Sequence, residues 1–264
     1  MQIGEVVPVE CKNSTGLEST IYILLLQLNY TEGMPETYVL PVGWEEIQGD
    51  ADARAIARIH FPETNEVGVL FDAATDQGFL SVLLEAIANS RSYTGAAGKL
   101  LGIPDKALTS EQDLSQLEPH VFKKEHSNTS AGYGDRFVLK LLRKVEEGIN
   151  PELEIGRFLT DRKLIQHFAP IAGSLEYQAS GKPVMTIGIL QKLIPDSRDS
   201  WSYTLDTLRD YFEQVMAVEG AFRISVFYTL IRILPLGLQS YNQKGFSPHN
   251  NEAYHHRHDR LSMV

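Results

Sequence analysis

The chain has 264 residues, 43% of them hydrophobic, a formal net charge of -10 and a single cysteine, Cys11. This length and apolar content support a folded core in one large domain or two smaller ones. The acidic balance argues against a general nucleic-acid or anionic-membrane binder. One cysteine excludes an intramolecular disulfide and a cysteine-based zinc site, and it fits a reducing cytoplasm. The N-terminus has no secretory-signal pattern, and the apolar runs at 21–28 and 221–238 are too short or too interrupted to span a bilayer.

The first part of the chain predicts mainly β-structure. Strands are expected near residues 6–9, 22–29 and 36–41, which form a meander, and again at 67–72. Residues 50–59 have a helical composition, and residues 76–88 have the clearest helical pattern, with apolar side chains on one face. We therefore predict a curved antiparallel sheet that holds one or two helices over residues 1–103. The polar residues 104–120 are expected to form a linker.

A phosphate-binding pattern follows the linker. The small and polar residues 127–134 predict a sharp turn whose backbone N–H groups could bind phosphate. The next strand, at residues 136–143, is apolar at its centre except for Lys140. A helix is predicted over residues 151–163, with Asn150 as its N-cap and with Glu152 and Glu154 in its first turn.

Two interpretations of Lys140 remain open at this point. Loop, strand lysine and helix glutamate come in the order in which protein-kinase-like lobes bind ATP. The same pattern fits an ordinary hairpin in which Lys140 lies on an edge strand and extends to water. From the pattern alone, the two interpretations have equal weight.

The remaining elements continue the kinase-like order. Strands are predicted at residues 171–178 and 184–193, joined by a hairpin turn, and an amphipathic helix at 201–216. In kinase-like lobes the chain that leaves the second of these strands is the hinge, which contacts adenine. Gln191, Lys192 and Leu193 hold that place here. Residues 240–264 have no apolar period and are expected to form a loose tail.

Several long, ordered stretches resemble bacterial maltokinase, including the form that is fused to trehalose synthase. They are Ser-Asn-Thr-Ser at 127–130 with the strand and helix to residue 160, residues 25–41, residues 69–102 with spaced glycines, and residues 190–195 and 201–206. The resemblance implies an α+β fold: a cystatin-like cap at 1–103, a linker at 104–120, a kinase-like nucleotide-binding subdomain at 121–195 and the start of a helical C-lobe at 196–264. It implies transfer of the ATP γ-phosphoryl group to maltose, giving maltose 1-phosphate, in trehalose and glycogen metabolism.

The resemblance also implies roles for individual residues. Lys140 would contact the phosphates, and Glu154, in preference to Glu152, would orient Lys140. The residues that would cover the phosphates or hold adenine are Ser127, Asn128, Thr129, Ser130, Gln191, Lys192 and Leu193.

The chain departs from the family beyond the hinge. There the family has a catalytic aspartate in a His-Gly-Asp type loop and a later magnesium-binding aspartate, and no aspartate here lies in such a motif. His256 and Asp259 resemble a catalytic loop only superficially. We therefore expect no catalytic or metal-binding residue in this chain, with Mg²⁺ bound only by the complete enzyme. The expected protein is a fragment, truncated at both ends and inactive by itself.

An alternative is a non-catalytic module that positions a partner such as trehalose synthase. The missing C-lobe pattern motivates this alternative.

Two clusters of polar residues have simpler explanations than a site. Asp72 and Asp76 with Glu85 resemble an acid/base set only by their number, and capping and solvated faces explain them better. A histidine cluster near the C-terminus could bind metal, but a solvated tail explains it better; its members are His249, His255, His256 and His258.

Overall fold

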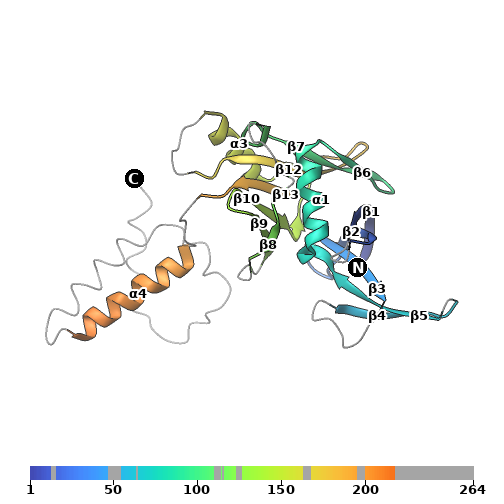
Figure 1. The fold of residues 1–264 in the computed structure, drawn as a ribbon, viewed down its shortest axis with the longest axis horizontal. Helices are drawn as coiled ribbons and strands as arrows, with labels where there is room; N and C mark the ends of the chain where they lie inside the picture. Colours follow the sequence, from blue (N-terminus) through green and yellow to red (C-terminus); the bar gives the residue numbers. More distant parts are fainter. Residues whose placement is uncertain are drawn as a thin grey trace. The chain divides into compact units, whose positions relative to one another are not determined.

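The computed structural model describes residues 1–12, 16–46, 55–63, 65–109, 114, 116–122, 127–162, 168–194 and 200–217. The chain divides into two compact units, Met1–Asp196 and Ser197–Val264, which are described separately. The first unit is α+β and contains two antiparallel sheets with few helices (Figure 1). The described part of the second unit is the helix α4 (Ser200–Ala217), as the sequence predicts.

The first sheet has the strand order β1-β2-β3-β5-β4, and a short strand, β11, pairs with β3 beside β5. The predicted meander of the first three strands is confirmed. Residues 55–59, which were predicted to be helical, lie in a strand that pairs with β5, because ladder hydrogen bonds override a weak helical composition. The bounds are β1 (Gln2–Lys12), β2 (Glu18–Leu28), β3 (Glu36–Glu46), β4 (Ala55–Phe61), β5 (Glu66–Asp72) and β11 (Lys144–Val145).

Helix α1 (Gln77–Ala88) begins where the sequence predicts. The Asp76 carboxylate accepts a hydrogen bond from the Phe79 N–H at 2.9 Å, and Asp72 caps the preceding 3-10 turn η1 (Ala73–Thr75) in the same way. The capping interpretation of both aspartates is confirmed. The apolar side of α1 is fully buried and includes Phe79, Leu80, Leu83 and Ile87.

The second sheet has the strand order β6-β7-β12-β13-β10-β9-β8. The sequence grouped β6 and β7 with the N-terminal sheet, but β7 pairs with β12 and so extends the second sheet. The domain boundaries themselves remain a prediction. The bounds are β6 (Ser92–Thr94), β7 (Gly98–Pro104), β8 (Pro119–Val121), β9 (Asn128–Tyr133), β10 (Phe137–Leu142), β12 (Ile171–Ala179) and β13 (Met185–Lys192); the short helix α2 (Lys106–Thr109) follows β7.

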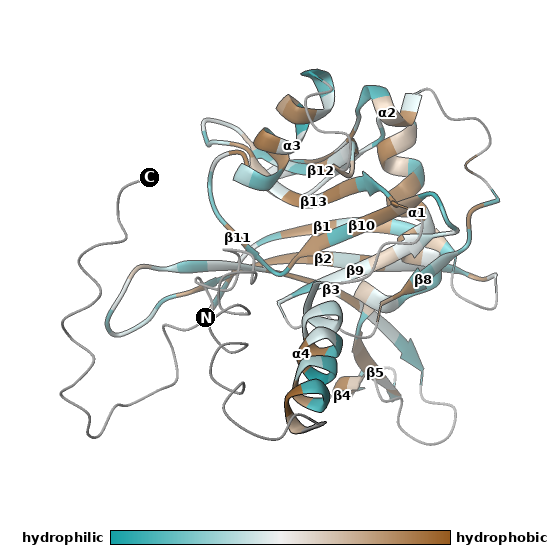
Figure 2. Cartoon of the chain, turned by 90° about the vertical axis from the view of Figure 1, so that its left-hand side faces the viewer, coloured by the Kyte–Doolittle hydropathy of each residue, from teal (hydrophilic) through white to brown (hydrophobic). Residues whose placement is uncertain are grey.

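Helix α3 (Pro151–Arg162) packs on one face of the second sheet, and α1 and the first sheet lie toward the other (Figures 1 and 2). Its N-cap is Asn150, whose side-chain oxygen accepts from the Glu152 N–H at 2.8 Å. Leu153 is buried with Ile171 and Ile189 of the sheet. A Cβ at Gly156 would lie 2.7 Å from the Ile171 side chain, so glycine allows the close approach of helix and sheet.

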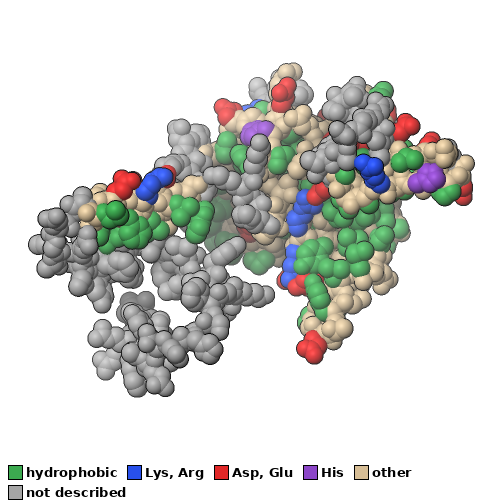
Figure 3. Space-filling view, turned by 90° about the horizontal axis from the view of Figure 1, so that it is seen from below, with side chains coloured by type: hydrophobic (Ala, Val, Ile, Leu, Met, Phe, Trp, Pro, Cys, Tyr) green, Lys and Arg blue, Asp and Glu red, His purple; other side chains and the backbone are tan. Residues whose placement is uncertain are grey.

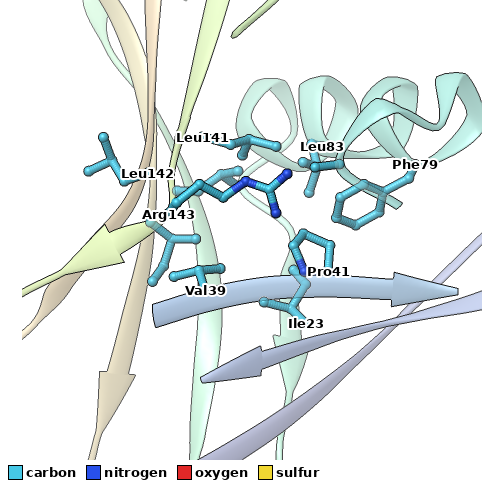
Figure 4. A pocket seen from close by; sticks show the side chains of 11 residues that line it. Ile23, Val39, Pro41, Phe79, Leu83, Leu141, Leu142 and Arg143 are labelled. Atoms are coloured by element: carbon cyan, nitrogen blue, oxygen red, sulfur yellow. The ribbon is translucent and has the colours of Figure 1, made fainter. Parts of the chain in front are cut away.

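The main core lies between α1 and the two sheets, and β10, β13 and α1 carry mostly hydrophobic residues there (Figure 2). A cavity of about 10 Å³ remains among these side chains, about the space that one water molecule needs (Figure 4). Arg143 is one of the residues that line this cavity. The guanidinium donates to Asp72 at 2.7 Å and to Thr129 at 3.0 Å, so a paired arginine connects β5 of the first sheet to β9 of the second.

Glu5 also connects the two sheets. Its carboxylate is 4% exposed and accepts hydrogen bonds from the Tyr177 hydroxyl and from the N–H groups of Val6, Ala96 and Ala97. Burial by itself raises the pKa of Glu5, but these hydrogen bonds outweigh burial and lower the pKa from its ordinary value of 4.5. Glu5 therefore fixes β1 to the β6–β7 turn and to β12.

The other face of the first sheet carries exposed aromatic side chains. Trp44 and Phe61 make an edge-to-face contact at 5.9 Å between ring centroids, and both rings are partly open to solvent. Figure 3 shows several groups of hydrophobic side chains on the molecular surface seen from below. Among the described residues, no helix has the length and apolar character needed to cross a membrane.

Candidate functional site

Lys140 lies on an interior strand of the second sheet, not on an edge strand. Strand β10 is hydrogen-bonded to β13 on one side and to β9 on the other, so the edge-strand interpretation is wrong. The neighbours Leu139 and Leu141 are buried in the main core, and Lys140 points to the opposite face, beneath α3. The Lys140 Nζ lies 2.9 Å from both carboxylate oxygens of Glu152.

The residue that pairs with Lys140 is Glu152, which corrects the preference for Glu154. Successive helical residues are about 100° apart, so two positions in the first turn face different directions. Glu152 lies on the side of α3 that reaches Lys140, whereas Glu154 lies about 200° further around the helix. The lysine side chain is 27% exposed and the glutamate 41%, so the pair is accessible from solvent.

The predicted phosphate turn is mostly a strand. Residues 128–133 form β9, and their backbone groups are in a ladder with β10, so they do not form the expected turn. The polar side chains of this segment favoured a turn, but strand pairing on both sides overrides that preference. Ser127 lies in a bend, and residues 123–126 lie outside the described part of the chain.

The register of β9 separates the predicted phosphate-binding side chains. Ser130 is opposite Lys140 and Asn128 is opposite Leu142, so both lie on the Lys140 face. Thr129 lies on the other face, where its hydroxyl accepts a hydrogen bond from Arg143 Nε. Thr129 is therefore occupied in connecting the two sheets and is directed away from Lys140.

The predicted hinge is the end of β13. Gln191 is opposite Val138 of β10 and thus lies on the Lys140 face. The Lys192 N–H donates to the Pro170 carbonyl at 2.9 Å, and the Leu193 N–H donates to the Arg136 carbonyl at 2.8 Å. These two donors, which the hinge prediction offers to adenine, are already used within the sheet and its loops.

The structure adds an aromatic pair that sequence analysis missed. His120 and Phe122 lie over Gly132, where an added Cβ would meet the His120 ring at 2.4 Å, and the two rings are 5.1 Å apart edge to face. Gly132 is opposite Val138, so these rings border the Lys140 face. The available signal in the sequence was a glycine that follows His120 and Phe122 by only about ten residues.

A second missed residue is Arg157 of α3. Its guanidinium donates to Asp105 at 3.0 Å, to Glu176 at 3.0 Å and to the Ser174 hydroxyl at 2.9 Å. Burial by itself lowers the pKa of Arg157, but the pairs with Asp105 and Glu176 outweigh it and raise that pKa. The sequence shows Arg157 only as one polar residue of an amphipathic helix, and its three partners are distant in sequence.

The remaining candidate residues do not add to this site. The described residues contain no group of three or more histidine, cysteine, aspartate or glutamate side chains that could hold a metal ion. The histidine cluster and Asp259 lie outside the described residues: His249, His255, His256 and His258. Lys144, four residues after Lys140, pairs with Glu36 at 2.5 Å on the first sheet, and Lys144 with Tyr30 and Tyr38 lowers the Glu36 pKa to about 2.

No family model matches the chain. Two solved structures are distantly similar: one is described as glucosamine kinase in complex with glucosamine, ADP and inorganic phosphate, and the other as glucosamine kinase in a second crystal form. Both have a TM-score of 0.41 and 12% sequence identity, and they cover 78% and 76% of this chain. The chain spans only 40% and 38% of the length of those proteins.

Proposed function

We propose that this chain carries the nucleotide-binding lobe of an ATP-dependent phosphotransferase. The observation that supports this proposal best is the bidentate contact of Lys140 with Glu152, on a face that also carries Ser130. A lysine on an interior strand, held by a helix carboxylate, is the arrangement that places a cation against ATP phosphates in kinase-like lobes. In this proposal Glu152 orients the ammonium group, and the ammonium group neutralises phosphate charge.

The base would lie on the hinge side of Lys140. Val138 is two residues from Lys140 on the same face, about 7 Å along the strand. Beyond Val138 lie His120 and Phe122, which offer apolar surface for a planar base. Since the N–H groups of Lys192 and Leu193 are used, we expect the adenine edge to contact backbone carbonyls at the end of β13.

On the resemblance to maltokinase, we further propose that the acceptor is maltose and the product maltose 1-phosphate. The first sheet with α1 would then be the cystatin-like cap. The groups that position the sugar hydroxyl and hold Mg²⁺ are not assigned to any of the described residues. The whole-enzyme activity is thus a proposal that goes beyond this chain.

Calorimetric titration with ATP tests the proposed site. The wild-type chain should bind ATP, and Lys140→Met should weaken binding by at least about tenfold, because a charge-assisted contact with phosphate is lost. Lys144→Met is the matched control, since Lys144 is also paired with a glutamate but lies on the first sheet. Absence of ATP binding by the wild type, or equal weakening by both substitutions, would overturn the proposal.

A further inference from the structure

Helix α3 is held to the second sheet unevenly along its length. Near its N-terminus, the polar contacts to the sheet are the partly exposed pair of Glu152 with Lys140 and a hydrogen bond from the Asn150 N–H to the Thr186 hydroxyl at 3.1 Å. Toward its C-terminus, Thr160 accepts from the Ile171 N–H at 2.9 Å, and Arg157 makes its three contacts. The second half of α3 is therefore the better anchored half.

Arg157 is the centre of this anchoring. It joins three separate segments: α3 itself, Asp105 before α2, and β12 through Ser174 and Glu176. The Ser174 side chain is fully buried and donates in turn to Glu176 at 2.7 Å, so the partners of Arg157 are themselves fixed. A planar guanidinium with several fixed partners restrains both the position and the rotation of the helix that carries it.

Arg157 can restrain the position of Glu152 because both residues belong to the same helix, α3. Arg157 follows Glu152 by five residues, about 7.5 Å along the helix axis. Between them, Leu153 and Gly156 are in close contact with the sheet, which leaves the helix little room to tilt. A rotation of α3 would move the Glu152 carboxylate away from a lysine that it now contacts through both oxygens.

We infer that Arg157 is a positioning residue for the proposed nucleotide site: it sets α3 so that Glu152 holds Lys140 in place for phosphate. The expected effect on ATP affinity rests on the proposed function. The expected effect of Arg157 on the contact between Glu152 and Lys140 does not. Arg157 acts on the same face of the second sheet as Lys140, because Ser174 is opposite Ile189 and Ile189 is opposite Lys140. Its hydrogen bonds go to Asp105 and to Ser174 and Glu176 of β12, two strands away from Lys140.

A double-mutant cycle on ATP affinity tests the inference. Arg157→Met and Glu152→Gln should each weaken ATP binding roughly tenfold, and the double substitution should be no weaker than the stronger single one, because both act through one contact. Adenosine has no phosphate, so its dissociation constants for the wild type, the two single variants and the double variant should agree within about twofold. A purely structural role would not separate ATP from adenosine in this way.

The control and the second variant address folding. The control is Lys106→Ala, which removes an exposed ion pair between Lys106 of α2 and Asp161 of α3. This substitution should leave ATP affinity unchanged. Arg157→Lys keeps the positive charge beside Asp105 and Glu176 but loses the planar set of donors. If Arg157→Met does not fold, Arg157→Lys should give an intermediate loss of ATP affinity with an unchanged circular dichroism spectrum.

Trace labelling of Lys140 with acetic anhydride separates this inference from the proposed function. If the wild type binds no ATP, the proposed function fails, but Arg157→Met should still raise Lys140 labelling several-fold, to the level in Glu152→Gln. Wild-type labelling of Lys140 in the Arg157 variants would overturn the inference. Losses of ATP affinity that multiply in the double variant would also overturn it.

Discussion

At the scale of single residues, the protein stabilises a partly exposed charge, Lys140, and a buried charge, Glu5, in different ways. Lys140 is partly exposed and has one carboxylate partner, which leaves its remaining donor directions open to solvent or ligand. Glu5 is buried and has its oxygens satisfied by one hydroxyl and three backbone N–H groups. The first arrangement suits a binding residue, and the second suits a structural one.

Glu5→Gln should destabilise the protein in a pH-dependent way. The folded-state pKa of Glu5 lies below 4.5, so its ionised form contributes stability above that pH, and the contribution is lost as pH falls through the folded-state pKa. At pH 7 we expect a loss of about 2 kcal/mol in the free energy of unfolding, since hydrogen bonds to a buried charge are removed or weakened. Urea unfolding of both proteins from pH 7 to 3.5 measures the difference.

The control for this experiment is Glu10→Gln, an exposed position on the same strand. It should change the free energy of unfolding by less than about 0.5 kcal/mol. A Glu5→Gln difference that stays constant or grows below pH 4.5 would contradict a lowered pKa for Glu5.

At the scale of elements, the contact of α1 with β7 depends on a glycine. A Cβ at Gly102 would lie 2.1 Å from the Ala86 carbonyl oxygen of α1, so a side chain there must push helix backbone away from the sheet. This contact explains one of the spaced glycines that the sequence shows between residues 95 and 102. Gly98 is constrained in a similar way by the Tyr177 hydroxyl, at 2.4 Å from its added Cβ.

Gly102→Ala should therefore lower the free energy of unfolding by about 3 kcal/mol, because the clash is with backbone and cannot be relieved by a rotamer change. Gly4→Ala is a matched control in another strand, where the added Cβ would make only one contact, at 3.4 Å. Thermal and urea unfolding measure both effects. Equal stability of the two variants would show that α1 and β7 are not packed this closely.

Elements with a strong local signal were predicted well. Helices α1 and α3 have caps in the sequence, α1 also has an apolar face, and both helices begin where the caps predict. Strand β9 was predicted as a turn because its small and polar residues have no apolar period, and only its pairing with β10 makes it a strand. The choice between Glu152 and Glu154 depended on the rotation of α3, which the sequence does not determine.

At the scale of the whole first unit, two sheets pack around α1 and are connected by polar contacts as well as by the apolar core. Arg143 connects β5 to β9, and Glu5 connects β1 to β12. Neither contact was predicted, because each joins residues that are far apart in the sequence. The same reason explains why β6 and β7 were grouped with the first sheet, since strand patterns do not specify their partners.

The most direct measurement of the central claim uses an acyl-phosphate derivative of ATP, which transfers its acyl group to an amine beside the bound phosphates and releases ATP. After digestion, mass spectrometry identifies the acylated lysines. The account predicts acylation of Lys140, suppressed by excess ATP, with little acylation of the exposed control Lys106. Equal acylation of Lys140 and Lys106, or acylation of Lys140 that excess ATP does not reduce, would contradict a nucleotide site on this face of the sheet.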